Sequence, residues 1–459
     1  MGRRIPGVIV ASSIAVYFFA LAGRGLRADF TYDDLLNLYF AWIRPLPDLF
    51  RANLLFFRPP TRSLGALYYA LGFHFAGLNA APYRVVCFGF LCANIWLTYC
   101  FARRLTGSRE IAALACLLHA YHGSAAALYY NSGTCYDVFC FFFYFSALIY
   151  YLRIRQTGAV PRPSQIALLV CLYIAALNSK EMAVTLPVTI GVYELLYHKG
   201  ENWRQRSFTM AVLGAITAAY VIGVTRGPGS LADLPGYRPV ISAASYVLQT
   251  RSYLNDLIYS ENAFGNPRSV AALASLFAIA WLSRDRRLKY CCLFITIGVL
   301  PIAFITPRGL YAVYIPMVGL AIFVAILLAR AVSFAHDPRV RASLFVAAAL
   351  ALAAIHAKNG APNVSEISGE ERHVRDVIGQ IERLYPQVPK GSRILLVKDP
   401  FEGRVWDSTF LLRLFYRDNS LVIDRAADRH APEKYDYVWT FEDGKLLDIK
   451  KGDRMRSAK

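Results

Sequence analysis

The sequence predicts an all-α, multi-pass membrane protein that carries a small soluble α/β domain near its C-terminus. Of its 459 residues, 56% are hydrophobic and only 18% are charged, a more apolar balance than soluble globular proteins show. The apolar residues also gather in runs such as "AVLGAITAAYVIGV" and "GLYAVYIPMVGLAIFVAILLA". These runs approach or reach the roughly 20 residues that cross a bilayer. After Lys358 the composition changes to mixed charge, which predicts a separate domain outside the membrane.

About eleven transmembrane helices are expected from the apolar runs. They lie near 6–23, 83–102, 110–121, 136–152, 164–178, 182–197, 208–225, 267–283, 289–305, 309–330 and 342–357. The first run follows "MGRR" but shows no clear small-x-small cleavage site, so it is interpreted as a retained helix. The nine cysteines lie in or beside apolar runs and show no disulfide framework or zinc spacing, which is typical of core residues.

The connections between these spans alternate in charge. "ARRLTGSR", "YLRIRQTG" and "SRDRRLK" are basic, whereas "HGSAAALYYNSGT" and "ITPRG" are nearly free of Lys and Arg. The positive-inside rule places the basic set in the cytoplasm. The N-terminus is then cytoplasmic, and the C-terminal domain is extracytoplasmic. Because the net charge of +19 is read as loop charge, it indicates no nucleic-acid partner.

Two domains follow from this pattern: a membrane domain over 1–357 and an extracytoplasmic domain over 358–459. Within the first, residues 24–81 form a long outer loop. Its stretch "RSLGALYYALGFHFAG" is interpreted as interfacial, because another crossing would turn every later basic loop outward. In the second domain, "EERHVRDVIGQIERLYPQV" and "DSTFLLRLFYRD" predict helices. "SRILLVKDP", "NSLVID" and "YDYVWTFEDGKLLDI" predict strands, the last with an Asp-Gly hairpin turn.

Several stretches together resemble one family. "ADFTYDDLLNLYF", "HAYHGSAAALYYNSGTCYDV", "NSKEMAVTLPVTIGVYELL" and "RGLYAVYIPMVGL" resemble, in this order, segments of GT-C glycosyltransferases of the protein O-mannosyltransferase-like group. That group includes the transmembrane-and-tetratricopeptide mannosyltransferases, but this chain has no such repeats. It also departs from the family at Ala120, at Ser124 and by an insertion over Asn131–Cys135. The resemblance covers roughly residues 25 to 330. It implies transfer of a sugar from a polyprenyl-phosphate donor to an acceptor at the outer face.

Such a transfer needs a carboxylate base that takes the proton of the attacking hydroxyl. Asp33 and Asp34 are the candidates, and the resemblance favours the first of the pair, Asp33. The alternative is a structural pair, because Thr31 can cap a helix that begins at Tyr32, with Asp34 answering three residues on. Asp29 is expected to be a solvated loop residue.

The departing lipid phosphate needs cationic partners at headgroup depth. Arg308 is the first candidate, because it is nearly alone in its outer loop and precedes the span that carries Tyr314. Lys180 lies at an outer turn, where the neighbouring Glu181 may instead neutralise it. Arg58 and Arg62 flank "PPT" and could bind substrate phosphate or lipid headgroups, and interface anchoring is also an alternative for Arg308.

His119 and His122 are three residues apart, a spacing that places them on one helix face if the helix continues. The only further ligand in prospect is the distant Asp137, so a structural pair is favoured over a metal site. No cofactor is therefore expected, and a divalent metal stays an open alternative. His122 and Asp137 are kept as substrate-site candidates, since an acid within a span marks function by default.

The sequence thus predicts a membrane glycosyltransferase of hexosyl or mannosyl type. Its partners would be the polyprenyl-phosphate sugar, membrane lipids and a protein or glycan acceptor. Three alternatives remain: a lipid-linked glycan ligase or polymerase, a lipid or sugar transporter, and a catalytically inactive homologue. The last follows from the resemblance, because Ser124 stands where the family commonly has glutamate. Transporters favour internal repeats, and none is visible here. A bacterial inner membrane is favoured over the endoplasmic reticulum, because the outer segments lack cysteine pairs.

Overall fold

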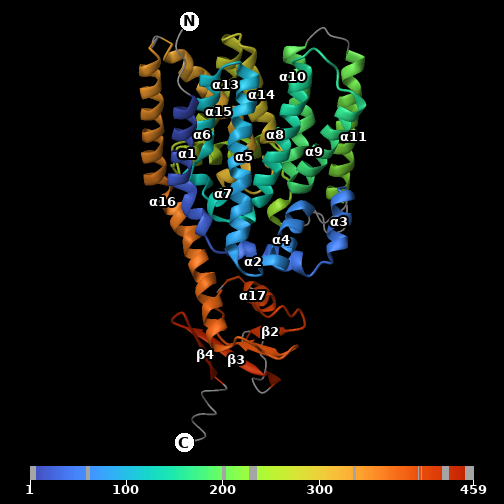
Figure 1. The fold of residues 1–459 in the computed structure, drawn as a ribbon, viewed down its shortest axis with the longest axis vertical. Helices are drawn as coiled ribbons and strands as arrows, with labels where there is room; N and C mark the ends of the chain where they lie inside the picture. Colours follow the sequence, from blue (N-terminus) through green and yellow to red (C-terminus); the bar gives the residue numbers. More distant parts are fainter. Residues whose placement is uncertain are drawn as a thin grey trace, which may run out of the picture.

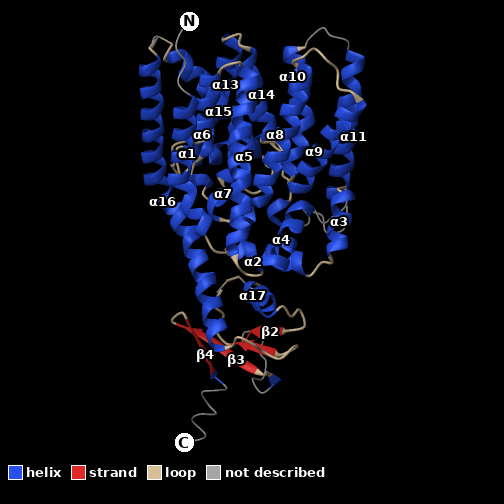
Figure 2. Ribbon diagram, viewed as in Figure 1, coloured by secondary structure: helices blue, strands red, loops and turns tan. Residues whose placement is uncertain are grey.

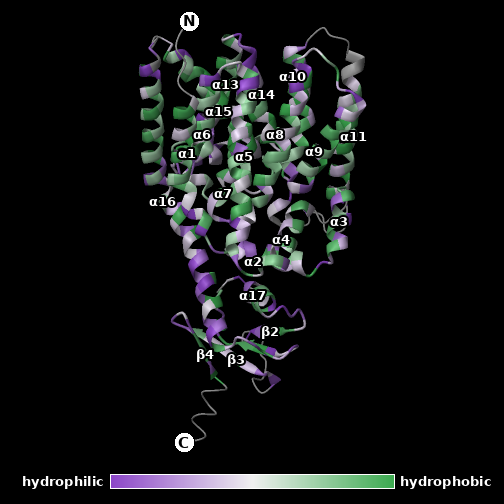
Figure 3. Ribbon diagram, viewed as in Figure 1, coloured by the Kyte–Doolittle hydropathy of each residue, from purple (hydrophilic) through white to green (hydrophobic). Residues whose placement is uncertain are grey.

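The computed structural model describes residues 7–57, 62–198, 203–226, 235–333, 337–401, 403–404, 406–425 and 434–449. A bundle of roughly parallel helices forms its upper part, and a small mixed domain hangs below it on one long helix (Figures 1 and 2). The green, apolar ribbon is concentrated in the bundle, whereas the lower half of the long helix is mostly polar (Figure 3). The chain is therefore a multi-pass membrane protein.

Each predicted span overlaps a helix, although the bounds differ by several residues, and for the span predicted at 289–305 the helix already ends at Gly298. These helices are α1 (Gly7–Ala22), α5 (Ala80–Thr106), α6 (Arg109–Ala120), α8 (Cys135–Arg155), α9 (Pro163–Ser179), α10 (Leu186–Tyr197), α11 (Trp203–Arg226), α13 (Asn266–Leu282), α14 (Arg286–Gly298), α15 (Tyr314–Ala331) and α16 (Pro338–Leu384). Within the described residues, six helical segments are long and apolar enough to cross a bilayer, and they contain α1, α5, α8, α11, α15 and α16. The other five are shorter than the roughly 20 residues of an ordinary span.

Short 3-10 and α-helical segments connect the spans. They are η1 (Gly23–Arg27), η2 (Gly123–Ala125), α7 (Ala127–Tyr130), η3 (Ser132–Thr134), η4 (Glu181–Thr185), η6 (Pro235–Tyr237) and η7 (Leu310–Val313). A further helix, α12 (Ala243–Leu257), lies in a connection for which the sequence analysis proposed no element. It packs against α13 and η7, so it belongs to the same body.

The basic connections gather at one end of the bundle and interlock there. Arg287 donates to Asp285 at 2.7 Å, and Arg330 binds the same carboxylate. Arg341, at the start of α16, donates to Glu110 of α6 at 3.1 Å. These contacts hold connections from distant parts of the sequence at the end of the bundle opposite the C-terminal domain (Figure 1).

Three short helices lie at the end that carries the C-terminal domain (Figure 1): α2 (Tyr32–Trp42), α3 (Leu46–Leu54) and α4 (Ser63–Ala76). The chain breaks between α2 and α3 because proline fits only the first turn of a helix, where α3 holds Pro47. With 14 residues, α4 is about 21 Å long, which is short of the roughly 30 Å hydrocarbon core. Because α6, α10 and α14 are no longer than α4, this length does not separate α4 from the predicted spans, and its interfacial position stays a prediction.

The helix α16 has 47 residues and is therefore about 70 Å long, more than twice the thickness of the hydrocarbon core. Its first half completes the bundle, and its polar second half projects beyond it (Figure 3). The boundary predicted at 357 thus falls inside one continuous helix. Near that point the helix packs closely on η2, because a Cβ added at Gly360 would lie 2.7 Å from the Cα of Gly123.

The C-terminal domain contains a four-stranded sheet in the order β2-β1-β3-β4. Strand β1 (Arg393–Leu396) pairs in parallel with β2 (Val422–Arg425) and β3 (Tyr437–Glu442), and β4 (Lys445–Asp448) is antiparallel to β3. Asp443 and Gly444 form the predicted hairpin turn with φ values of 49° and 72°, and two positive φ values are what a type I′ turn requires. The helix α17 (Asp407–Tyr416) packs against α2 and joins the domain to the bundle.

Candidate active site

The two adjacent aspartates at the start of α2 have different surroundings. Asp34 is fully buried, and its carboxylate accepts hydrogen bonds from the backbone N–H of Thr31 at 2.9 Å and from its hydroxyl at 3.1 Å. The Tyr69 hydroxyl donates a third bond at 2.7 Å. The expected capping arrangement of Thr31 and Asp34 is therefore present. Burial raises the pKa of the Asp34 carboxyl, and Arg84 and these donors oppose the shift.

In contrast to the buried Asp34, the Asp33 side chain is 65% exposed. The described neighbour of its carboxylate is Arg404 of the C-terminal domain, whose Nη1 lies 3.9 Å from Oδ1. On another side is η3, the predicted insertion: a Cβ added at Gly133 would lie 3.1 Å from the Cβ of Asp33. Of the two aspartates, Asp33 is the one that a substrate hydroxyl could approach.

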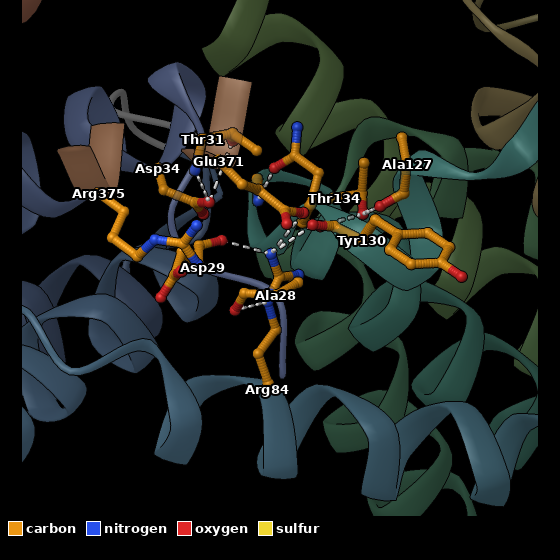
Figure 4. Close-up of polar contacts among 12 residues, drawn as sticks. Ala28, Asp29, Thr31, Asp34, Arg84, Ala127, Tyr130, Thr134, Glu371 and Arg375 are labelled. Carbon is orange, nitrogen blue, oxygen red and sulfur yellow. Dashed lines mark hydrogen bonds and ion pairs between the residues drawn. The ribbon is translucent and has the colours of Figure 1, made fainter. Parts of the chain in front are cut away.

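Arg84 fixes the segment that leads into α2, a role the sequence analysis did not identify. This arginine is buried near the start of α5, and it donates to the carbonyls of Ala28, Asp29 and Tyr130 (Figure 4). The last carbonyl belongs to α7. The guanidinium therefore joins Ala28 and Asp29, which lead to Asp33, to the end of α7, which precedes η3. Arg84 interrupts an apolar run, which is the one signal that could have marked it.

Two acidic residues connect this segment to the polar half of α16 (Figure 4). Asp29 pairs with Arg375 at 3.0 Å, so it is an ion-paired residue rather than simply a solvated one. Glu371 is buried, and its Oε1 lies 4.0 Å from Arg84 Nη2. Burial raises the pKa of Glu371 to about 7, and Arg84 partly opposes this while Asp29 and Asp34 add to it.

Lys180 and Asp137, predicted from separate motifs, form a buried ion pair. Lys180 follows α9, and Asp137 lies in the first turn of α8. The Lys180 ammonium also lies 5.5 Å from the ring centre of Tyr311 in η7. The carboxylate that offsets Lys180 is therefore Asp137 and not the neighbouring Glu181.

Glu181 instead binds Arg62. The Arg62 Nε and Nη2 atoms each donate to this carboxylate at 3.0 Å, a two-pronged contact that fixes the guanidinium plane. The guanidinium lies 5.7 Å from the ring centre of Tyr136 and 5.9 Å from that of Tyr237. The backbone of Arg62 is left-handed, with φ of 62°, immediately before α4. Arg58, predicted with it, lies outside the described residues.

Arg308 completes this group. Its guanidinium carbon lies 4.3 Å from the ring centre of Tyr237, and its Nη2 donates to the Gly236 carbonyl at 3.2 Å. Its Nε is buried and has no hydrogen-bond partner among the described residues. Tyr311 is within electrostatic range of Arg308, Asp137 and Asp33 and close to the Lys180 ammonium, so the predicted base and two of the predicted cations lie around one tyrosine.

Three predicted residues lie elsewhere. Tyr314 is buried in α15 and stacks on His119, with ring centres 4.8 Å apart, so its side chain faces the core of the helix bundle. His119 lies between Thr98 Oγ1 at 3.3 Å and the Tyr314 carbonyl at 3.1 Å. His122 lies 3.1 Å from the Leu257 carbonyl and accepts from the Ser124 N–H. The two histidines thus have separate protein partners, as the structural interpretation expects. Over the described ranges, no group of three or more His, Cys, Asp or Glu residues could hold a metal ion.

Comparisons with known proteins add the following. No protein-family model matches the chain, and no curated protein matches it in sequence. Among solved structures it is similar to ArnT from Cupriavidus metallidurans bound to undecaprenyl phosphate, with a TM-score of 0.53 at 15% identity over 95% of this chain and 93% of that one. For ArnT in the apo state the TM-score is 0.50 at 17% identity, over 91% and 85% of the two chains. The chain therefore has the GT-C fold that the sequence resemblance implies.

Proposed function

We propose that this protein transfers a sugar from a polyprenyl-phosphate donor to an acceptor hydroxyl, with Asp33 as the general base. The observation that carries the proposal is the contrast at the start of α2. The Asp34 carboxylate is occupied by the helix cap, whereas the Asp33 carboxylate is 65% exposed and lies near Arg404. A base must contact the proton that it takes, and only the open carboxylate meets that condition.

The cation cluster supports a phosphate leaving group. Glu181 offsets Arg62 and Asp137 offsets Lys180, so these two pairs are neutral together. Arg308 has no carboxylate partner among the described residues, and it is stacked on Tyr237. Arg308 is therefore the described cation near Tyr311 that is not paired with a carboxylate, and the exposed Asp33 balances its charge only at a distance. The Arg308 guanidinium can stabilise the charge that develops on a departing phosphate.

The reaction then needs few parts. The acceptor oxygen attacks the anomeric carbon, its proton passes to Asp33, and the bond from that carbon to the phosphate oxygen breaks. Arg308 is placed to bind the departing phosphate, and the paired Lys180 and Arg62 hold the surrounding walls in position. No step in this scheme requires a metal, although the chemistry does not exclude one.

The nature of the donor and the orientation of the chain are also proposals. The structural neighbour ArnT was solved with undecaprenyl phosphate, a polyprenyl carrier. The basic connections lie at the end of the bundle opposite Asp33, which favours a cytoplasmic location for that end. Asp33 and the C-terminal domain would then be extracytoplasmic, and we propose a bacterial inner membrane and a hexosyl, mannosyl-type donor.

The test uses purified wild-type protein in lipid nanodiscs with radiolabelled polyprenyl-phosphate-mannose and -glucose. Transfer to any acceptor, water included, is measured for wild type, Asp33→Asn and Asp48→Asn. Asp48 is an exposed aspartate in α3 and serves as the matched control. We expect Asp33→Asn to lower the rate by roughly 10²–10⁴-fold, the range that general-base catalysis provides, and Asp48→Asn to retain activity.

Two results would contradict the proposal. If Asp33→Asn transfers sugar at the wild-type rate, another group is the base. If wild type transfers no sugar from either donor but moves the labelled lipid across a sealed bilayer, the transporter alternative is correct.

A further inference from the structure

A groove of about 800 Å³ lies beside the candidate base, between the polar half of α16 and the C-terminal domain. Its walls come from parts of the chain that are far apart in sequence. Tyr32 of α2 lies at one end. One face of α16, from Gly369 to Gln380 but without Gly379, forms one side, and the loop after β1 and the Asp443–Gly444 turn form the other. The volume lies within the range of sites that bind small ligands.

Two residues that line the groove, Tyr32 and Arg404, adjoin the site of Asp33. The Tyr32 hydroxyl lies 3.1 Å from His373 Nδ1 across it. The Arg404 guanidinium lies 4.6 Å from the ring centre of Tyr32, and its Nη1 is 3.9 Å from the Asp33 carboxylate. Tyr32 and Arg404 therefore line the groove and adjoin the base at once. A molecule bound in the groove would have its end at Asp33.

Among the described residues, the charged side chains that line the groove balance. Arg372, Lys398 and Arg404 are cationic, and Asp376, Asp399 and Asp443 are carboxylates. A site built for a phosphate or another anion would carry an excess of cations. A site with donors and acceptors in equal number suits hydroxyl groups, since each hydroxyl both donates and accepts.

Aromatic rings alternate with these polar groups. His373 stacks on Phe401 with ring centres 5.2 Å apart, and Tyr32 packs edge-on against Phe401 at 5.6 Å. Phe441 adds a ring from the sheet. The faces of such rings are negatively polarised and attract C–H groups, which cover one side of a pyranose. A sugar likewise has an apolar C–H face and a rim of hydroxyl groups, so the groove is complementary to it.

We propose that this groove binds the acceptor of the transfer reaction as a net-neutral saccharide chain, with one end hydroxyl at Asp33. The proposal rests on the proposed function and specifies its acceptor. Recognition by the C-terminal domain would explain why Arg404 of that domain contacts the base directly. A lipid headgroup is disfavoured by the charge balance and by the position of the groove on the polar half of α16 (Figure 3).

Two glycines of α16 allow a matched test. A Cβ added at Gly369 or at Gly379 meets no atom within 4 Å, so a larger side chain can stand at either position without displacing the helix. Gly369 lines the groove, whereas Gly379 does not. Gly369→Trp should fill the groove, and Gly379→Trp should leave it open.

The measurement is saturation-transfer NMR on the full-length protein in nanodiscs, without donor. The probes are neutral hexasaccharides derived from mannan, glucan and xylan. We expect at least one of them to bind wild type and Gly379→Trp equally, and Gly369→Trp to weaken that binding by about tenfold or more. The proposal is overturned if none of the hexasaccharides binds wild type, or if the two Trp variants bind alike. Binding of a neutral Ser/Thr-rich decapeptide in their place, sensitive to Gly369→Trp, overturns it in favour of a protein acceptor.

A second readout separates this proposal from the proposed function. Release of sugar from the donor to water needs Asp33 and the cations but not the acceptor groove. Hydrolysis is therefore measured for wild type, Asp33→Asn and Gly379→Trp, and Gly379→Trp, which lies outside the groove, should keep the wild-type rate. If hydrolysis requires Asp33 while no saccharide binds, the catalytic proposal survives and the groove proposal fails. If a saccharide binds the groove but no donor is cleaved, the groove binds saccharide and the catalytic proposal fails.

Discussion

Tyr32 and His373 lie 341 positions apart in the chain, yet the hydroxyl of the first and Nδ1 of the second are 3.1 Å apart. This contact joins the first turn of α2 to the polar half of α16. Asp33 follows Tyr32 directly, so the position of the candidate base depends on a helix that begins inside the membrane bundle and ends at the C-terminal sheet. The predictions below examine the residues that hold this arrangement.

Removal of the Asp34 carboxylate should destabilise the protein more than the same change at Asp33. Asp34→Asn replaces an acceptor of three buried hydrogen bonds by an amide that can accept only at one oxygen. We expect a loss of about 1–3 kcal/mol in the free energy of unfolding, read as a lower melting temperature in detergent. Asp33→Asn is the matched control and should have the same melting temperature as wild type. Equal melting of the two variants would show that the cap contributes nothing.

Arg84→Ala should lower both stability and transfer rate. It leaves the carbonyls of Ala28, Asp29 and Tyr130 without their donor inside the protein, which we expect to cost roughly 3–5 kcal/mol. Ala28 and Asp29, which precede α2, would then no longer be connected to α7 through Arg84. Thermal unfolding and donor hydrolysis measure the two effects. Arg103→Ala, at an exposed position on the same helix, is the control and should change neither.

Stability should fall between about pH 4.5 and 7 through Glu371. Its pKa is raised to about 7 in the folded protein from 4.5, so within this window the folded state keeps a proton that the unfolded state has lost. The folded state therefore binds more protons, and its stability decreases as the pH rises through the window and levels off above it. Glu371→Gln resembles the protonated form, so its melting temperature should exceed that of wild type at pH 8 and approach it at pH 4.5. Parallel melting curves across this range would refute the assignment.

Arg308 should contribute to the rate rather than to folding. Arg308→Ala removes the one cation near Tyr311 that has no carboxylate partner among the described residues, so transfer and hydrolysis should both fall by roughly 10²-fold, as when one donor to a developing charge is lost. Arg308→Lys keeps the charge and should restore part of the rate. Arg238→Ala, an exposed arginine next to Tyr237, is the control. An unchanged rate in Arg308→Ala would exclude the proposed phosphate contact.

Much of the fold could be predicted because the signals are local. Apolar run length located the spans, Thr31 with Asp34 marked the start of α2, and the Asp-Gly pair marked the hairpin. The long outer connection gave no such signal for α12, whose alternating polar residues resemble a loop. The continuity of α16 was also missed, because the change to mixed charge after Lys358 suggested a domain boundary there.

The candidate site was predicted less completely, for a physical reason. Asp33, Lys180, Asp137, Arg62 and Arg308 were named from their motifs. The structure places all of these except Arg62 around Tyr311, and Arg62 lies with Arg308 at Tyr237. Their pairing was not foreseen, because Arg62 binds Glu181 across 119 residues. The parts contributed by Arg84 and Arg404 depend on contacts between distant segments, which no local pattern encodes. Tyr314 was named for its neighbourhood, but helical periodicity turns it toward His119.

The single helix α16 carries both the last span and the C-terminal sheet, so its length sets the distance and the orientation of the sheet relative to the bundle. A helix turns by about 100° and rises 1.5 Å per residue, so one residue inserted between Lys358 and Gly369 would swing the whole sheet about the helix axis. The close approach of Gly123 and Gly360 prevents the upper half from turning to compensate. The length of α16 is therefore under tighter constraint than its sequence. Seven inserted residues, close to two full turns, would restore the orientation of the sheet while moving it about 10 Å farther from the bilayer.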